Sequence, residues 1–236
     1  RCFSESTVRL ALFSLRWIVT FPINIEKEAA RSSSLIRGPE RRIRSERLAL
    51  KAVKPSRERL AFEVAPSPGR WRMIIRAGEV ADLPRLLEIY NPYVEHTHIT
   101  FDTELVTLED RHQWFADFGT TGPHRHFVVE AGGSVQGYAS SRVFRARRAY
   151  DRSVESSVYL APESGGAGFG SALYERLLDV LREEQGVHRV YGGIAIPNEA
   201  SVALHQRFGF KLVATFSEVG FKFGRYWDVV WFERSV

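Results

Sequence analysis

The chain has 236 residues, of which 44% are hydrophobic and 26% are charged, and its formal net charge is +5. This composition suits a globular protein with one or two domains. The single cysteine, Cys2, excludes an internal disulfide and a cluster of thiolate metal ligands. The best candidate for a membrane span, residues 8–25, contains Arg9 and Arg16, so we expect no segment that crosses a membrane.

Positive charge is concentrated before the only methionine, Met73. Residues 1–72 hold 16 basic and 7 acidic side chains, a net charge of +9, whereas residues 73–236 hold 17 and 21, a net charge of −4. The basic segment could be a disordered arm that touches nucleic acid or another anionic surface. It could also be an organelle-targeting segment, although its glutamates argue against this. We favour a third interpretation, translated sequence upstream of the natural start, and assign residues 1–72 no function.

From Met73 onward the pattern predicts regular elements. A short strand at 73–76 precedes a helix that begins near Asp82 and has Pro84 in its first turn, where proline is tolerated. The predicted buried stripe of this helix consists of Leu83, Leu86, Leu87, Tyr90 and Val94. A polar loop follows at 96–105.

The next elements alternate between helix and strand. A helix is expected at 108–118, with Trp114, Phe115 and Phe118 facing inward. The later elements are a strand at 127–130, a turn at Gly132-Gly133, strands at 135–143 and 153–160, a helix that ends near Gly186, a strand at 190–196, a helix opened by Asn198 and closed by Gly209, and strands at 212–221 and 227–233.

A glycine-rich stretch joins the strand at 153–160 to the helix that follows. It reads Gly165-Gly166-Ala167-Gly168-Phe169-Gly170-Ser171. Glycine lets backbone N–H groups converge, because no Cβ obstructs them. The start of the helix adds unpaired donors and the positive end of its dipole. This combination predicts a seat for a phosphate or pyrophosphate.

Three phosphate-binding patterns compete for this glycine loop, residues 165–171. A Walker loop requires Gly-Lys-Ser/Thr, but Gly170 precedes Ser171 without a lysine. A dinucleotide fingerprint requires Gly-x-Gly-x-x-Gly, whereas Gly166, Gly168 and Gly170 are spaced two apart. The pyrophosphate loop of the GCN5-related N-acetyltransferases (GNAT), Gln/Arg-x-x-Gly-x-Gly/Ala, is matched at Gly168-x-Gly170 but has Gly165 at its first position. A turn used only for tight strand–helix packing is the remaining alternative.

The element order predicts an α/β (α+β) fold with a mixed sheet and helices on both faces. It is also the order of the GNAT fold, whose twisted sheet is mostly antiparallel, and five spaced motifs resemble the phosphinothricin acetyltransferase branch of that family. These motifs are Gly137-Tyr138-Ala139, Phe144-Arg145-x-Arg147-x-Ala149-Tyr150, Val154-Glu155-x-Ser157-Val158-Tyr159, Asn198-x-x-Ser201-x-x-Leu204-His205 with Gly209-Phe210, and Val219-Gly220-Phe221-Lys222-x-Gly224-Arg225. The resemblance covers residues 73–236 and none of 1–72.

The resemblance implies an enzyme that binds acetyl-CoA and an amine together, so that the amine attacks the thioester directly. The strand before the glycine loop would splay from its neighbour, and the backbone of Val158, Tyr159 and Leu160 would bond the pantetheine arm and polarise the thioester carbonyl. Asn198 would contact the CoA arm, cap a helix, or do both. The implied contacts to the pyrophosphate come from Gly165, Gly166, Ala167, Gly168, Phe169, Gly170 and Ser171.

The resemblance also implies catalytic roles. An attacking amine must be neutral, and Glu155 matches the family's base, although a free glutamate titrates near ~4.3 and would need burial or a water relay. The alternative is a solvated strand glutamate. His205 stands where many acetyltransferases have a tyrosine that protonates the departing thiolate; the alternative is a helix histidine satisfied by packing.

Candidates for the acceptor pocket are Phe101, Arg145, Arg147 and Tyr150. An arginine suits a substrate carboxylate or phosphinate, because its fork matches two oxygens. The histidine pairs His96-x-His98 and His124-x-His126 lie outside any HExxH pattern, so we expect no metal.

We therefore expect a cytoplasmic, acetyl-CoA-dependent N-acetyltransferase that acts on the α-amine of a small amino acid or an analogue such as phosphinothricin or methionine sulfoximine. A homodimer is expected from the family, and no nucleic-acid partner is expected for residues 73–236. One alternative is a protein or peptide N-terminal acetyltransferase, which would need an open groove. Another is a non-catalytic CoA-binding regulatory module, which Gly165 leaves open.

Overall fold

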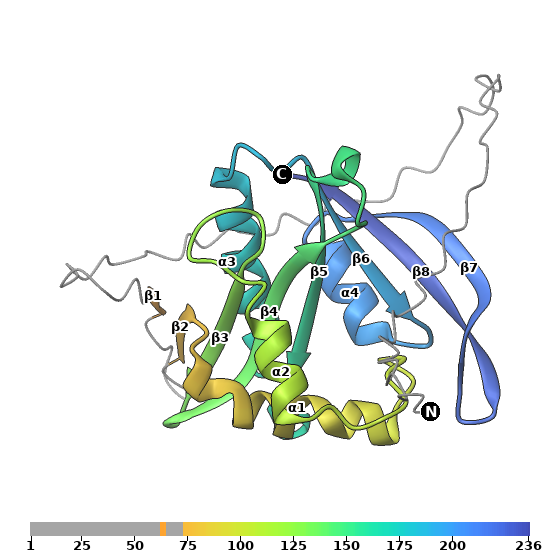
Figure 1. Ribbon diagram of the computed structural model, residues 1–236, viewed down its shortest axis with the longest axis horizontal. Coiled ribbons are helices and arrows are strands. Elements are labelled where there is room, and N and C mark those ends of the chain that lie inside the picture. Colours follow the sequence, from red (N-terminus) through yellow and green to blue (C-terminus); the bar gives the residue numbers. More distant parts are fainter. Residues whose placement is uncertain (1–61, 65–72) are drawn as a thin grey trace, which may run out of the picture. The chain divides into compact units, whose positions relative to one another are not determined.

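The computed structural model describes residues 62–64 and 73–236, and these residues form an eight-stranded sheet (Figure 1). The strands are β1 (Phe62–Val64), β2 (Met73–Ala77), β3 (His126–Ala131), β4 (Ser134–Val143), β5 (Ser153–Leu160), β6 (Arg189–Ala195), β7 (Lys211–Lys222) and β8 (Arg225–Ser235). Their order across the sheet is β1-β2-β3-β4-β5-β6-β8-β7. Only β5 and β6 pair in parallel within this described sheet, which confirms the mixed, mostly antiparallel prediction.

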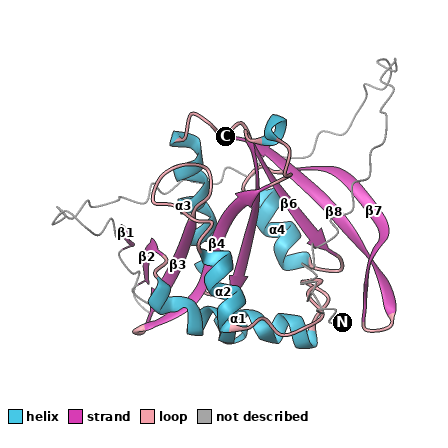
Figure 2. Ribbon diagram, viewed as in Figure 1, coloured by secondary structure: helices cyan, strands magenta, loops and turns pink. Residues whose placement is uncertain are grey.

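Helices cover both faces of the sheet, as predicted (Figure 2). The helices are α1 (Leu83–His96), α2 (Leu108–Phe115), α3 (Phe169–Glu183) and α4 (Glu199–Arg207), with short 3-10 turns η1 (Val80–Asp82), η2 (Arg148–Tyr150) and η3 (Pro162–Ser164). Alternate residues of a strand point to opposite faces. On β3, Phe127 and Val129 therefore pack in the layer of α3, whereas Val128 packs in the layer of α1.

Fully buried leucines form the centre of each layer. Leu173 and Leu177 of α3 and Leu83 and Leu86 of α1 are each 0% exposed. Burying one such side chain is worth about 1.5–3 kcal/mol, so the two layers hold the helices against the sheet. No helix in the described part of the chain is long and apolar enough to cross a membrane.

Three details differ from the sequence-based expectation. The stripe of α1 buries Ile89, and Leu87 is only half-buried. Helix α2 ends at Phe115 instead of residue 118, because the N–H groups of Asp117 and Phe118 bond three residues back, which tightens the last turn.

The third difference is β1, which lies in the basic segment and pairs antiparallel with β2, where no strand was expected. The other expectations for residues 1–72 lie outside the described residues.

Strands β5 and β6 pair over a short distance only. Their register runs from Ser153↔Arg189 to Glu155↔Tyr191, although β5 continues to Leu160 and β6 to Ala195. Beyond this point the two strands diverge (Figure 1). We call the opening the β5–β6 gap; backbone groups that face it have no ladder partner across it.

Candidate active site

The β5–β6 gap is lined on one side by backbone groups of Val158 and Leu160. The N–H of Ala161 donates to the carbonyl of Gln136 on the β4 side, at 2.8 Å. Because alternate residues of an antiparallel strand bond to the same partner strand, Tyr159 also directs its backbone toward β4. Of the three residues predicted to offer backbone groups, Val158 and Leu160 are therefore the two oriented toward the gap.

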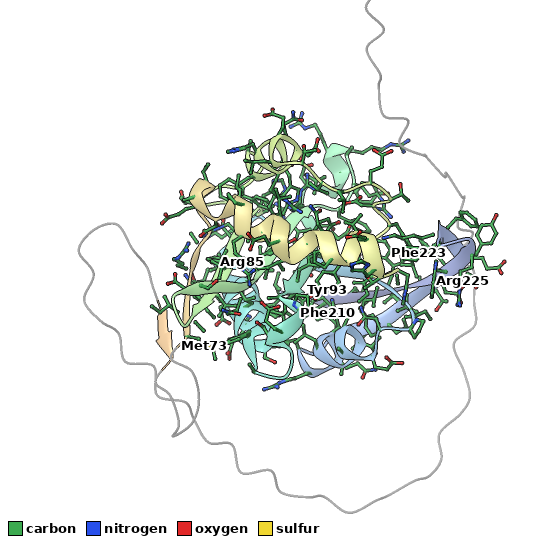
Figure 3. The ribbon with its side chains drawn as sticks, turned by 90° about the horizontal axis from the view of Figure 1, so that it is seen from below. Met73, Arg85, Tyr93, Phe210, Phe223 and Arg225 are labelled. Carbon is green, nitrogen blue, oxygen red and sulfur yellow. The ribbon has the colours of Figure 1, made fainter. Side chains whose placement is uncertain are left out.

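Tyr93 fixes the end of β5 next to this gap. Its side chain projects from α1 (Figure 3), and its hydroxyl donates to the carbonyl of Leu160 at 2.7 Å. The Tyr93 ring also packs on Tyr159, with ring centroids 5.4 Å apart. Burial raises the pKa of Tyr93, so the hydroxyl keeps its proton and remains a donor.

The glycine loop has the geometry of an anion seat. Gly166 has φ +77° and Gly168 has φ +85°, a left-handed conformation that favours glycine. Gly168 is the N-cap of α3 and no side chain caps this helix, so its first N–H groups have no side-chain partner. A Cβ at Gly165 or Gly166 would meet nothing within 4 Å, which means that the loop borders open space.

Two loop side chains turn away from this seat. Phe169 is 4% exposed and Ala167 is partly buried, and both pack in the α3 layer. Only their backbone groups can face a ligand.

Asn198 caps α4. Its Oδ1 accepts a hydrogen bond from the N–H of Ser201 at 3.1 Å, which confirms the helix-cap interpretation.

Glu155 lies at the last paired position of β5, between Arg142 of β4 and Tyr191 of β6. Its neighbour Val154 is buried in the α3 layer, so Glu155 points to the opposite side, which we call the Glu155 face. Its half-buried carboxylate has no hydrogen bond or ion pair with any described residue. Burial raises the pKa of Glu155, and the charges of Arg145 and Arg142 oppose this in part.

An aromatic wall with a guanidinium stands beside Glu155. Phe144 stacks on Tyr191 with ring centroids 4.2 Å apart. The guanidinium carbon of Arg145 lies 4.3 Å from the Phe144 ring centroid and 5.5 Å from that of Trp231. The structure thus brings Arg145, a predicted pocket residue, to the Glu155 face.

The other two predicted pocket residues of this segment are more peripheral. Arg147 precedes η2 and is exposed, and Tyr150 within η2 is 43% exposed. Tyr150 contacts the edge of Phe144, with centroids 6.2 Å apart.

Phe101 lies on the same side of the sheet, over the β7–β8 hairpin. On β8, Val230 and Phe232 pack in the α3 layer, so the alternating residues Trp227 and Trp231 point to the Glu155 face. Gly220 pairs with Trp227 and shares its face, and the ring of Phe101 occupies the space where a Cβ of Gly220 would stand.

The structure places His205 in the core of the α3 layer. The ring is 6% exposed, Nδ1 lies 2.8 Å from the carbonyl of Ser201, and the ring packs on Tyr174 and Phe210. Burial lowers the pKa of His205, which favours the neutral ring. This geometry is that of a histidine held by packing. Its Nε2 is buried without a hydrogen-bond partner among the described residues and lies against Gly192 of β6, so the acid role of His205 stays a prediction.

Sequence reasoning missed three residues of the Glu155 face. Ser157 shares a hydrogen bond with Ser140 at 3.0 Å, Trp231 has a buried indole N–H without a partner in the described residues, and Tyr93 bonds to Leu160. The position of Tyr93 one helical turn after Tyr90 is a signal that could have indicated its direction.

The histidine pairs are distributed over different environments. His98 stacks on Trp227 with ring centroids 3.9 Å apart, and its Nε2 lies 2.9 Å from the carbonyl of Pro197. His126 is buried among aromatic rings, and this burial lowers its pKa to about 3. The described residues contain no group of three or more His, Cys, Asp or Glu side chains suited to a metal ion.

The raised pKa of Glu155 predicts a pH-dependent effect on stability. The folded protein binds this proton more tightly than the unfolded chain, so stability falls as the pH rises from the ordinary glutamate range through the raised pKa. We expect Glu155→Gln to be as stable as the wild type in mild acid and more stable at neutral pH, measured by urea unfolding across this range. Glu175→Gln on the exposed face of α3 is the control; a Glu155→Gln variant that is less stable at neutral pH would contradict the prediction.

The chain is similar in sequence to known acetyltransferases. Residues 75–231 match the family described as acetyltransferase (GNAT) domain. The chain is 51% identical over 171 residues to a phosphinothricin N-acetyltransferase of Streptomyces coelicolor, which covers 72% of this chain and 99% of the relative. It is 36% identical over 162 residues to an L-methionine sulfoximine/L-methionine sulfone acetyltransferase of Pseudomonas aeruginosa, covering 69% and 94%.

A solved structure extends the likeness to the fold. The crystal structure of a GNAT superfamily phosphinothricin acetyltransferase from Sinorhizobium meliloti in complex with acetyl-CoA superposes with a TM-score of 0.65 at 31% identity, covering 69% of this chain and 87% of the other. With the splayed strands, the glycine loop and the matched residues together, the chain belongs to the GNAT family of acetyltransferases.

Proposed function

We propose that this protein transfers an acetyl group from acetyl-CoA to the α-amine of a small amino acid or analogue, of the phosphinothricin or methionine sulfoximine type. The observation that carries the proposal is the β5–β6 gap, which begins beside Glu155 and ends at the glycine loop. The names of the relatives support the same acceptor class. Residues 73–236 would form the catalytic domain, and the enzyme would work in the cytoplasm, where its cosubstrate is available.

Acetyl-CoA fits the chemistry of the gap in two places. The N–H groups of the glycine loop at the start of α3 would hold the diphosphate, because a helix N-terminus favours negative charge. The backbone of Val158 and Leu160 would bond the pantetheine arm in the manner of an added strand. The thioester would then lie in the gap, near Glu155.

Glu155 would act as the general base in this reaction. An amino acid's α-ammonium must lose a proton before its nitrogen can attack, and a carboxylate with a raised pKa is a better match for that proton. The neutral nitrogen then bonds to the thioester carbon and the C–S bond breaks. The new amide nitrogen loses its extra proton and the departing thiolate gains one, so the products are the N-acetyl compound and the free thiol of CoA. Holding both reactants in line supplies a large part of the rate.

The acceptor would bind across the Glu155 face. Arg145 would pair with its carboxylate or phosphinate, because guanidinium and carboxylate form two parallel hydrogen bonds. The position of Phe101 on one side and of Phe144 with Arg145 on the other favours a small molecule over a peptide N-terminus. A non-catalytic CoA-binding module would not need a carboxylate with a raised pKa beside the gap.

Removing the base tests the catalytic assignment. Positioned bases contribute about 100-fold or more to rate, so we expect Glu155→Gln to lower kcat by at least this factor with L-phosphinothricin as acceptor. The affinity for acetyl-CoA should stay near that of the wild type, because Glu155 lies at the far end of the gap. Thiol release measures the rate, with Glu175→Gln as control; full activity of Glu155→Gln would remove this residue as the base.

A pair of glycine substitutions tests the proposed cosubstrate seat. Gly168→Ala places a Cβ at φ +85°, which costs about 1–2 kcal/mol and distorts the start of α3. We expect a Kd for CoA raised by about tenfold, measured by titration calorimetry. Gly165→Ala is the matched control, since its φ of −61° and open surroundings accept a methyl group. Equal affinities in the two variants would argue against the loop as the diphosphate seat.

We also propose a homodimer, supported by the edge strand β7. Its exposed apolar side chains include Leu212, Phe216, Val219 and Phe221, each at least 45% exposed. An edge strand with such side chains favours pairing with another chain. Sedimentation should give twice the monomer mass for the wild type and for Thr121→Asp, and the monomer mass for a Val219→Asp/Phe221→Asp variant. A monomeric wild type would refute this proposal.

A further inference from the structure

We propose that Lys222 and Gly220 of β7, together with Tyr90 of α1, are positioning residues for the acceptor. They hold Phe101 as a fixed wall at one end of the pocket on the Glu155 face. This inference rests on the proposed function and deepens it. It assigns part of acceptor recognition to residues of α1 and β7 that do not themselves touch the reacting atoms.

Gly220 provides the surface on which Phe101 rests. A Cβ built on Gly220 would lie 2.1 Å from the ring Cζ of Phe101 and 2.4 Å and 2.5 Å from its two Cε atoms. The φ of Gly220 lies outside the left-handed region, so the position requires the absence of a side chain and not an unusual backbone. The ring therefore sits directly against the β7 backbone.

Lys222 holds the residue before Phe101. Gly220 and Lys222 lie two residues apart on one face of β7 and are both buried, whereas Val219 and Phe221 between and beside them are exposed. The Lys222 Nζ donates to the carbonyl of Thr100 at 2.8 Å, and the residue is 5% exposed. It forms no ion pair with a described residue. Burial lowers the pKa of Lys222, and the nearby charge of Asp102 opposes this in part, which favours the ammonium that bonds the Thr100 carbonyl.

Tyr90 holds the residues on both sides of Phe101. Its hydroxyl donates to Oδ2 of Asp102 at 2.7 Å and lies 2.6 Å from Oγ1 of Thr100. The Tyr90 ring packs edge-on against Tyr159 of β5, with centroids 4.9 Å apart. Thr100 and Asp102 are thus tied to α1, and Thr100 also to β7, so Phe101 is fixed from two elements.

The segment carrying Phe101 crosses the Glu155 face at the hairpin end. His98, three residues earlier, stacks on Trp227, and Figure 3 shows Phe223 and Arg225 close to each other at the tip of this hairpin. We assign the opposite wall to Phe144 and Arg145, which pack on each other near Glu155. The fixed position of Phe101 limits the size of the acceptor side chain that the pocket can hold. Because the ring is ordered before the acceptor binds, less conformational entropy is lost on binding.

Steady-state kinetics of Lys222→Met tests the inference. Methionine keeps the length and volume of the chain but cannot bond the Thr100 carbonyl. We expect the KM for L-phosphinothricin to rise about tenfold or more, with the KM for acetyl-CoA and the saturated kcat unchanged. Lys222→Arg should restore part of the affinity. Lys211→Met, at an exposed position of the same strand, is the matched control and should resemble the wild type.

Gly220→Ala provides an independent test that does not bury or remove a charge. Its methyl group would displace the Phe101 ring, so the KM for the acceptor should rise in the same selective way. Hydrogen exchange of residues 97–105 should increase in Lys222→Met whether or not the enzyme turns over. Unchanged acceptor KM values in both variants, an equal rise of both KM values, or unchanged exchange would overturn the inference. If the wild type showed no acetyltransferase activity while hydrogen exchange of residues 97–105 still increased in Lys222→Met, the proposed function would be refuted. The role of these residues in acceptor binding would then be refuted as well.

Discussion

The site depends on the early end of the ladder between β5 and β6. Strand β5 pairs with β4 from Val154 to Leu160, and β6 pairs with β8 over its full length from Arg189 to Ala195. Each strand therefore bonds alternate residues to its outer neighbour, and within the described sheet only three residue pairs join the two halves. Backbone groups of β5 that face the gap have no ladder partner on β6 beyond Glu155, and the Leu160 carbonyl is bonded by the Tyr93 hydroxyl instead.

The same joint brings the chemical groups together. Glu155 is the last residue of β5 that still pairs with β6, so the carboxylate stands where the gap begins. The strand then runs to the glycine loop, where α3 starts with uncapped N–H groups. A ligand whose anionic end and reactive end are separated by about the length of β5 could contact the N–H groups of α3 and the Glu155 carboxylate at the same time. The fold thus sets the distance between the anion seat and the carboxylate by the length of β5.

Local patterns predicted much of this arrangement, and the misses have physical causes. The glycine loop could be found because Gly166 and Gly168 occupy conformations that other residues avoid. The family resemblance of its strand indicates Glu155, and the burial of Val154 together with strand alternation then decides the face that Glu155 occupies. The surroundings of His205 could not be predicted locally, because a helix of nine residues has a weak pattern and the ring lies beside Gly192 of β6. Tyr93 bonds to Leu160, 67 residues away, and Lys222 bonds to Thr100, 122 residues away. A pattern of neighbouring residues cannot predict contacts over such sequence separations.

Burial of Glu155 lowers the stability of the fold at neutral pH and at the same time makes the carboxylate a stronger base. Removing a carboxylate from water without a compensating partner raises its pKa and destabilises the folded chain at neutral pH. A residue selected only for stability would be paired, as Asp82 is with Arg76 at 2.7 Å, or replaced by an apolar side chain. Arg145 and Arg142 lie near enough to lower the pKa of Glu155 but make no ion pair with it among the described residues. An unpaired carboxylate held next to two guanidinium groups is consistent with a site in which charge is left available for a substrate.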